Sequence, residues 1–347
     1  MKDKLIIITL SLLLWGCNQP QNTTAQNTEN NNDKTYAIAF YNLENLFDTE
    51  RDTSINDSEY TPQSAKQWDK EKYNKKLDNL SYVISLLGKD KCAEGAAIVG
   101  VAEVENKKVL QDLANHSNIA TINYQIVHYD SPDPRGIDVG FLYNPKLFKV
   151  ISSERHKFSY PSNTRYNTRD ILLVNGTMNG EAFHILVNHW PSRRGENSEE
   201  LRIHAAKQCK SISDSIYRTN NNAKIIIMGD LNDNPTNTSC RTILKAKQHQ
   251  KDVKKGGLYN TMWNLYAEGL GSARYRNTWD LFDQIIVSES LTGNKQAGLK
   301  FQEAEIFNKD FLFQQSGQYK GHPLRTFSGN TFLNGYSDHF PTIIYLK

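Results

Sequence analysis

The sequence predicts a layered α/β sandwich, in which two mixed β-sheets pack face to face and helices cover their outer faces. Segments with the apolar patterns of strands and of helices intermingle along the chain, about nine or ten strands with about four helices. Their order requires both parallel and antiparallel connections. Polar residues recur where apolar segments end, and such positions gather along one edge of a sheet, where functional sites are built.

The composition is that of a folded protein without an unusual charge. Of 347 residues, 38% are hydrophobic and 23% are charged, a mixture that can fill a core and argues against wholesale disorder. The net charge is 41 − 38 = +3, so any binding of nucleic acid requires a local basic patch. The four cysteines lie too far apart for a Cys-x-x-Cys zinc site, and a single disulfide stays open: Cys17, Cys92, Cys209 and Cys240.

The N-terminus has the pattern of a secretion signal. Residues 5–16 carry no charge and are too few to span a bilayer. They lead into Leu-Trp-Gly-Cys, which resembles a bacterial lipobox ending at Cys17. We therefore expect a signal peptide at 1–16, a lipidated Cys17 with a flexible linker over 17–34, and a location in the cell envelope, periplasmic or surface-exposed. The alternative is an ordinary cleaved signal peptide in which Cys17 is incidental.

The linker gives way to a folded part over 35–347. Within 18–34, nine of seventeen residues are Asn or Gln, so this stretch has almost nothing apolar to bury. Apolar runs then predict strands at 36–42 and 96–102. A helix is predicted over 69–89 by five apolar residues at helical spacing, and another over 106–116.

The rest of the folded part alternates strands with one long helix. An Asn179-Gly180 pair joins two apolar segments and predicts a hairpin. The run KIIIM at 224–228 predicts a buried strand that breaks into Gly-Asp-Leu-Asn. The helix is predicted over 199–217, and the strands over 124–129, 137–143, 171–178, 182–188, 224–228, 280–288 and 342–346.

The polar residues at the strand ends have the chemistry of a hydrolytic metal site. Carboxylate and amide oxygens suit Mg²⁺, Mn²⁺ or Ca²⁺, and a histidine beside a carboxylate can activate water. Singly, each residue has a plainer explanation, such as a turn shaped by Asp230 and Asn232 or a core position for His339. Together they predict metal-assisted hydrolysis, with a phosphate ester as the substrate. The residues are Asn42, Glu103, Asn188, His189, Asp230, Asn232, Asp283, Asp338 and His339.

The order of these residues resembles that in the endonuclease/exonuclease/phosphatase superfamily, over about 36–345. The motif GDLND at 229–233 matches the family's Gly-Asp-x-Asn, and YSDHFP at 336–341 matches its terminal Ser-Asp-His-x-Pro. Four further segments resemble its other motifs: FYNLENL at 40–46, VAEVE at 101–105, VNHW at 187–190 and FDQII at 282–286. The resemblance implies a four-layer α/β sandwich.

The resemblance also implies roles for the strand-end residues. Glu103 is expected to hold the metal, with Asp338 and Asn42 contributing directly or through water. Asp283 is expected to fix the tautomer of His339, which acts as base or as electrostatic clamp.

The remaining expected roles concern water and phosphate. Asp230 and Asn232 are expected to orient the attacking water, and His189 to contact the phosphate. Asp138 is a weaker candidate for orienting His189. Because water is the nucleophile, no covalent intermediate is expected.

The segment after the VNHW motif suggests the substrate. Trp190, Arg193 and Arg194 adjoin the predicted catalytic histidine, and Arg276 repeats the basic theme, a combination suited to a phosphate backbone and a base. The plainer alternatives are a core position for Trp190 and a solvated loop for the arginines. The long polar segment 291–334 fits no pattern beyond an insertion that rims the site.

Three functions remain open at this stage. The first is a nuclease or phosphodiesterase that acts on nucleic acid or nucleotides outside the cytoplasm. The second is a phosphatase or phosphodiesterase that acts on lipid head groups or inositol phosphates. The third is an inactive surface lipoprotein that only binds its ligand. A membrane contact is expected through the lipid anchor alone, and no obligate protein partner is inferred.

Overall fold

The computed structural model describes residues 34–293 and 297–347. The described residues belong to one compact unit, Asn32–Lys347. The predicted signal peptide, the predicted lipidation site Cys17 and all but the last residue of the predicted linker lie outside the described residues. Within the described residues, we find no helix with the length and apolar character needed to cross a bilayer.

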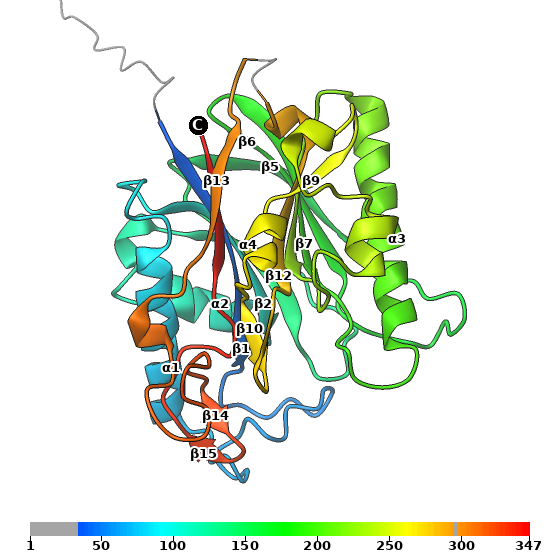
Figure 1. Ribbon diagram of the computed structural model, residues 1–347. Coiled ribbons are helices and arrows are strands. Elements are labelled where there is room, and N and C mark those ends of the chain that lie inside the picture. Colours follow the sequence, from blue (N-terminus) through cyan, green and yellow to red (C-terminus); the bar gives the residue numbers. More distant parts are fainter. Residues whose placement is uncertain (1–33, 294–296) are drawn as a thin grey trace, which may run out of the picture. The chain divides into compact units, whose positions relative to one another are not determined.

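Two six-stranded mixed sheets form the centre of the fold (Figure 1). Sheet I has the strand order β13-β16-β1-β2-β4-β3, in which β1 and β2 are parallel and the other neighbours antiparallel. Its strands are β1 (Tyr36–Leu46), β2 (Ala96–Val104), β3 (Gln125–His128), β4 (Asp138–Tyr143), β13 (Phe301–Ile306) and β16 (Thr342–Leu346).

Sheet II has the order β5-β6-β7-β8-β12-β9, in which β7 and β8 are parallel and the other neighbours antiparallel. Its strands are β5 (Phe148–His156), β6 (Ile171–Met178), β7 (Glu181–His189), β8 (Lys224–Asp230), β9 (Leu258–Asn260) and β12 (Asp283–Ser288). As predicted, Asn179 and Gly180 join β6 to β7, both with positive φ.

Helices lie outside the two sheets. The helices α1 (Lys70–Leu86) and α2 (Lys107–Ala114) belong with sheet I, and α3 (Ser198–Thr219) belongs with sheet II (Figure 1). The carboxylate of Asp69 caps α1 by accepting the N–H of Lys72. The shorter helical elements are η2 (Ala120–Ile122), η3 (Ser239–Ile243), η4 (Gln250–Asp252), α4 (Trp263–Ala267), η5 (Glu289–Leu291) and η6 (Asp310–Leu312).

The period-two alternation of the strands builds the core between the layers. In β8, Ile226 and Met228 belong to the core cluster shared with sheet I, whereas Ile225 and Ile227 pack in the cluster beneath α3. The two sheets approach closely at Gly100, where an added Cβ would lie 2.5 Å from the sulfur of Met228. This sequence of helix, sheet, sheet and helix confirms the predicted α/β sandwich.

Several strands were not predicted from the sequence. The edge strand β5 is mostly exposed and polar, so it lacks the alternation that identifies a half-buried strand. The predicted strand 280–288 begins only at Asp283, because Asp280 ends the second strand of a hairpin and Leu281 and Phe282 connect it to the sheet. The other unpredicted strands are short or lie in the insertion: β9, β10 (Ala273–Tyr275), β11 (Thr278–Asp280), β13, β14 (Phe327–Ser328) and β15 (Thr331–Phe332).

Candidate active site

The two sheets bring their polar strand ends to one edge. In sheet II, His189 at the end of β7 pairs with Asp230 at the end of β8. Asp230 pairs in turn with Asp283 at the start of β12, so these three residues form a row across the sheet. The C-terminal end of β7 lies very close to Gly229, where an added Cβ would lie 2.2 Å from the Asn188 carbonyl oxygen. Only glycine fits there, which explains the first residue of the Gly-Asp-x-Asn motif.

His339 joins this row through a short polar contact with Asp283. The Nδ1 atom of His339 lies 2.6 Å from Oδ2 of Asp283, and the Ser272 hydroxyl donates to the same oxygen at 2.5 Å. Burial acts to lower the pKa of His339, but the carboxylates of Asp283, Asp230 and Asp338 outweigh it and hold the pKa well above its usual value. The imidazole therefore carries a positive charge, with Nε2 directed towards Asp230 at 4.0 Å.

Asp230 lies at the centre of the site. Its Oδ1 accepts the backbone N–H of Asn232 at 2.9 Å, and its Oδ2 accepts the amide N–H of Asn42 at 3.1 Å. Burial raises the pKa of Asp230 to about 7, against the opposing charge of His339. A carboxylate with a pKa near neutrality is suited to accept a proton from water.

His189 faces the same carboxylate from β7. Its Nε2 lies 3.6 Å from Oδ2 of Asp230 and 3.9 Å from Oε1 of Glu103. Burial, and then the positive charges of Arg169 and Arg135, lower the pKa of His189 well below its usual value, so the ring is neutral. The site thus combines one charged and one neutral histidine.

The expectation that Asp138 orients His189 is wrong. The Asp138 carboxylate contacts Nε2 of His128 at 3.1 Å and accepts the backbone N–H of Ser131 at 2.8 Å. The Nδ1 atom of His189 is buried and has no hydrogen-bond partner within the described residues. Asp138 contacts His128 and not His189 because β3 and β4 are paired, which brings His128 beside it.

Sequence reasoning missed the residue that holds the end of β7. The Arg169 guanidinium donates to the backbone carbonyls of His189 at 3.2 Å and Trp190 at 2.6 Å. Asp133 balances its charge at 2.8 Å. Arg169 and Asp133 lie outside every motif, and a buried arginine has no sequence pattern of its own.

Glu103 and Asp338 are the two carboxylates that the sequence predicts to hold the metal. Glu103 has a left-handed backbone (φ 61°), and its Oε2 accepts the N–H of Asn45 at 3.0 Å. Its Oε1 is 3.7 Å from the guanidinium of Arg135 and 3.9 Å from His189, beyond hydrogen-bond distance. Asp338 accepts the guanidinium of Arg325 at 2.6 Å. Burial acts to raise the pKa of Asp338, but the charges of His339 and Arg325 lower it.

Asn42, which the sequence predicts to contribute to the metal site, contacts the carboxylate of Asp230 in this structure. Its side-chain nitrogen faces Asp230, while its amide oxygen accepts the backbone N–H of Glu44 at 2.9 Å. One group of potential ligand atoms in this site, all within 4.8 Å of one another, belongs to Asp230, Asp283 and His339. Because the latter two share a hydrogen bond, we regard them as a proton-holding pair and Glu103 with Asp338 as the better ligands for a hard cation.

Trp190, which the sequence predicts to bind substrate, lies in the core, the plainer of the two positions that the sequence left open. The indole is only 2% exposed and packs in the core cluster beneath α3. Its N–H donates to Oδ1 of Asn188 at 3.2 Å. As the residue that directly follows β7, Trp190 turns into the helix-facing layer and away from the site.

Arg193 braces the loop that carries Asn232. Its Nε donates to the Asn232 carbonyl at 2.9 Å, its Nη1 lies 3.3 Å from Asp280, and its guanidinium lies 4.5 Å from the ring of Phe282. Most hydrogen-bond donors of the Arg193 guanidinium are therefore already bound to protein groups. Arg194, the next residue, is exposed.

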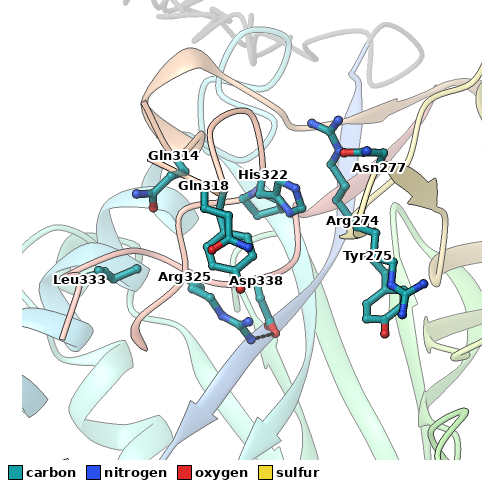
Figure 2. Close-up of a pocket in the computed structure, with 12 residues that line it drawn as sticks. Arg274, Tyr275, Asn277, Gln314, Gln318, His322, Arg325, Leu333 and Asp338 are labelled. Atoms are coloured by element: carbon teal, nitrogen blue, oxygen red, sulfur yellow. Dashed lines mark hydrogen bonds and ion pairs between the residues drawn. The ribbon is translucent and has the colours of Figure 1, made fainter. Parts of the chain in front are cut away.

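A pocket of about 480 Å³ adjoins the row of catalytic candidates (Figure 2). Figure 2 shows Arg274 and Tyr275 on one side and Gln318 and His322 on the other, with the Arg325–Asp338 ion pair below Gln318 and His322 in this view. The hairpin β10–β11 and the insertion form its walls. Its lining residues include Arg274, Tyr275, Arg276, Tyr319, His322, Arg325 and Asp338.

This pocket explains part of the segment 291–334, for which the sequence offered no account beyond rimming the site. It also places Arg276, predicted to bind substrate, in the pocket wall, at the turn between β10 and β11. The basic residues of the pocket were missed because they come from two segments without any common spacing.

One known group of proteins combines these sequence motifs with an α/β sandwich and a site at the strand ends. A sequence model described as the Endonuclease/Exonuclease/phosphatase family matches residues 37–347. The chain belongs to the endonuclease/exonuclease/phosphatase family. Members of this superfamily are metal-dependent phosphoester hydrolases, and so is this chain. No curated protein sequence matches it.

Solved structures share the fold at low sequence identity. A D. rerio TDP2 complexed with a single-strand DNA product has 14% identity and a TM-score of 0.53, covering 91% of this chain and 100% of that one. A family protein from Bacteroides thetaiotaomicron has 16% identity and a TM-score of 0.56, covering 90% of this chain and 95% of that one. A mannosyl-6-phosphatase from the same organism has 16% identity and a TM-score of 0.55, covering 90% and 99%. At these identities the likeness establishes the fold alone.

Proposed function

We propose that this family member is a phosphodiesterase that hydrolyses nucleic acids or nucleotides, with Mg²⁺ as its metal. The observation that carries the substrate class is the pocket beside Asp338. Its arginines suit phosphate, and its exposed tyrosine rings, Tyr275 and Tyr319, suit the face of a base. The metal dependence itself follows from the family.

The chain's own residues divide the work of hydrolysis among them. Asp230 takes the proton of the attacking water, since its pKa of about 7 places it near neutrality. The charged His339 and the neutral His189 donate hydrogen bonds to the phosphoryl oxygens from two sides. As water attacks phosphorus, the ester bond to the leaving oxygen breaks, and no covalent bond to the protein forms.

Positioning residues keep these groups in place. Asp283 and Ser272 hold His339, and Asn42 holds the second oxygen of Asp230. Glu103 and Asp338 would hold Mg²⁺, which supplies positive charge that stabilises the phosphate oxygens in the transition state. Mn²⁺ or Ca²⁺ would suit the same oxygen ligands.

A substrate panel tests the proposal. The purified protein is incubated with Mg²⁺, with Mn²⁺ or with EDTA, and offered plasmid DNA, single-stranded RNA, bis-p-nitrophenyl phosphate, sphingomyelin and inositol polyphosphates. Metal-dependent cleavage of DNA, RNA or nucleotides is expected. Turnover of lipid or inositol phosphates alone would overturn the nucleotide assignment and support the second function that the sequence left open. Family membership already argues against the third, an inactive binding lipoprotein.

We also propose that the protein acts in the cell envelope, attached through a lipid on Cys17. The support is the lipobox-like sequence before this residue. Cells that express the chain are fed labelled palmitate, and the label is expected in the wild type but not in Cys17→Ser. Cys92→Ser, at a buried free cysteine, is the matched control. Label retained in Cys17→Ser would contradict the anchor.

A further inference from the structure

We propose that the pocket beside Asp338 binds a second phosphoryl group of the substrate, so that the enzyme selects nucleotides or nucleic-acid ends that carry a phosphate besides the one it hydrolyses. The inference rests on the proposed function and names the members of the nucleotide class that the site prefers. It assigns a role to the hairpin β10–β11 and to the insertion before the last motif.

The pocket is fixed to the catalytic row through the backbone. Asp338 lines the pocket and precedes His339 in sequence. Ala273 of β10 forms a bridge with His339, and the N–H of Phe340 donates to the Ser272 carbonyl at 2.7 Å. The pocket therefore has a fixed position relative to His339. When the reacting phosphate of a substrate faces His339, a second phosphoryl group of the same substrate can lie in the pocket.

The insertion is tied to the hairpin by aromatic contacts beneath the pocket. The ring of Phe313 lies 6.4 Å from Trp279 on β11 and 4.8 Å from Phe340. Trp279 and Phe340 are themselves 5.6 Å apart. These contacts bury the apolar side of both segments and leave their polar side chains to form the pocket walls.

The charge of the pocket favours an anion. Three arginines and one carboxylate line it, and the carboxylate, Asp338, is already paired with Arg325. Arg325 also contacts Glu44 at 3.2 Å. Arg274 and Arg276 form no ion pair within the described residues, so two positive charges remain for a ligand.

Arg274 is held in advance in one orientation. Its Nη1 donates to the Gly321 carbonyl at 2.8 Å, and its guanidinium lies 5.3 Å from the ring of Trp279. Its buried Nε has no hydrogen-bond partner within the part of the chain described. A planar guanidinium that is held in one orientation and still has an unused hydrogen-bond donor is suited to bind phosphate.

The size and rim of the pocket limit the ligand to a small group. Its volume of about 480 Å³ falls within the range of small-molecule sites, roughly 300–1,000 Å³. Tyr275 and Tyr319 are 69% and 46% exposed at its edge, which favours a nucleoside over an inositol ring because bases stack on aromatic side chains.

Matched dinucleotides test this proposal. Thymidine dinucleotides with a terminal phosphate, on the 5′ or the 3′ end, are compared with the same dinucleotide without one. We expect kcat/KM to be about tenfold higher for one of the phosphorylated forms, the scale of one charge-assisted hydrogen bond. Arg274→Gln and Arg276→Gln should each lower this ratio about fivefold or more, whereas Arg218→Gln, on the exposed end of α3, should leave it unchanged. A wild-type ratio near one, or a ratio that survives in both pocket variants, would overturn the proposal.

A binding measurement separates this inference from the proposed function. If the protein cleaves no nucleotide, calorimetry still compares thymidine 3′,5′-bisphosphate with thymidine 5′-monophosphate. Binding of the bisphosphate about tenfold tighter, and lost in Arg274→Gln, supports the pocket. Equal affinities overturn it. Tighter binding of inositol 1,4-bisphosphate than of the nucleoside bisphosphate would overturn the choice of a nucleotide.

Discussion

Nδ1 of His339 lies 2.6 Å from Oδ2 of Asp283, across two segments that are 56 residues apart in sequence. Asp283 is buried and also accepts the hydroxyl of Ser272. This contact fixes the ring so that its other nitrogen faces Asp230. It therefore sets both the charge and the direction of the histidine on which the proposed mechanism depends.

Replacing the carboxylate of this pair should disable the site without unfolding the protein. In Asp283→Asn, the neutral amide no longer stabilises the charged imidazole, and we expect kcat on bis-p-nitrophenyl phosphate to fall by about 10²-fold or more. Steady-state kinetics measure the loss, and circular dichroism checks the fold. The exposed Asp252→Asn is the control and should keep the wild-type rate. Equal activity in the two variants would show that the pair is not needed.

Arg193 and Arg194 should have separable effects although they are neighbours. Arg193→Ala removes the brace on the Asn232 loop, so kcat/KM should fall about tenfold or more on every substrate, small aryl diesters included. Arg194→Ala should weaken only nucleic-acid substrates and reduce the dependence of their binding on salt. Kinetics on bis-p-nitrophenyl phosphate and on single-stranded DNA at several salt concentrations distinguish the two. Loss confined to nucleic acid in Arg193→Ala would contradict its positioning role.

Trp190 should matter for stability. Trp190→Ala removes a buried indole and should lower the free energy of unfolding by about 3–5 kcal/mol. Trp190→Phe keeps most of the volume but loses the hydrogen bond to Asn188, and should cost about 1 kcal/mol. Urea denaturation measures both. Wild-type stability in Trp190→Ala together with weaker substrate binding would restore the contact with substrate that the sequence suggested.

The buried Lys76 should make stability depend on alkaline pH. Burial lowers the pKa of Lys76 to about 8, although Glu44 opposes the shift, whereas the unfolded chain has the usual value near 10.5. Between these values the unfolded state binds more protons, so stability rises with pH from about 8 towards 10.5. Denaturation of the wild type and of Lys76→Met at pH 7.5, 8.5 and 9.5 isolates this group. The wild type should gain stability relative to the variant as pH rises, and a constant difference would contradict the lowered pKa.

The sequence predicted the fold and most of the catalytic row because both follow from short-range patterns. Apolar runs such as KIIIM identify strands, and the polar residues that follow β7 and β8 must meet because parallel strands end at one edge. Asp230 and His189 come together for this reason. Asp283 and His339 could be paired only through the family resemblance, because nothing local in the sequence joins β12 to the last motif.

The errors arose where tertiary packing decides the direction of a side chain. Trp190 and Arg193 follow a catalytic histidine, yet one enters the core and the other braces a loop, and no local spacing separates these outcomes. Asp138 was linked to His189 by analogy, but the pairing of β3 with β4 placed His128 beside it. The basic pocket was missed because its hairpin and its insertion are polar and aperiodic.

The most direct test of the account is the metal-dependent rate of His339→Ala on bis-p-nitrophenyl phosphate. His249→Ala, at an exposed histidine, is measured alongside, and each protein is assayed with Mg²⁺ and with EDTA. We predict that EDTA abolishes turnover without unfolding the protein, and that His339→Ala lowers kcat by about 10²-fold or more while His249→Ala keeps the wild-type rate. Full, metal-dependent activity in His339→Ala would contradict the proposed mechanism.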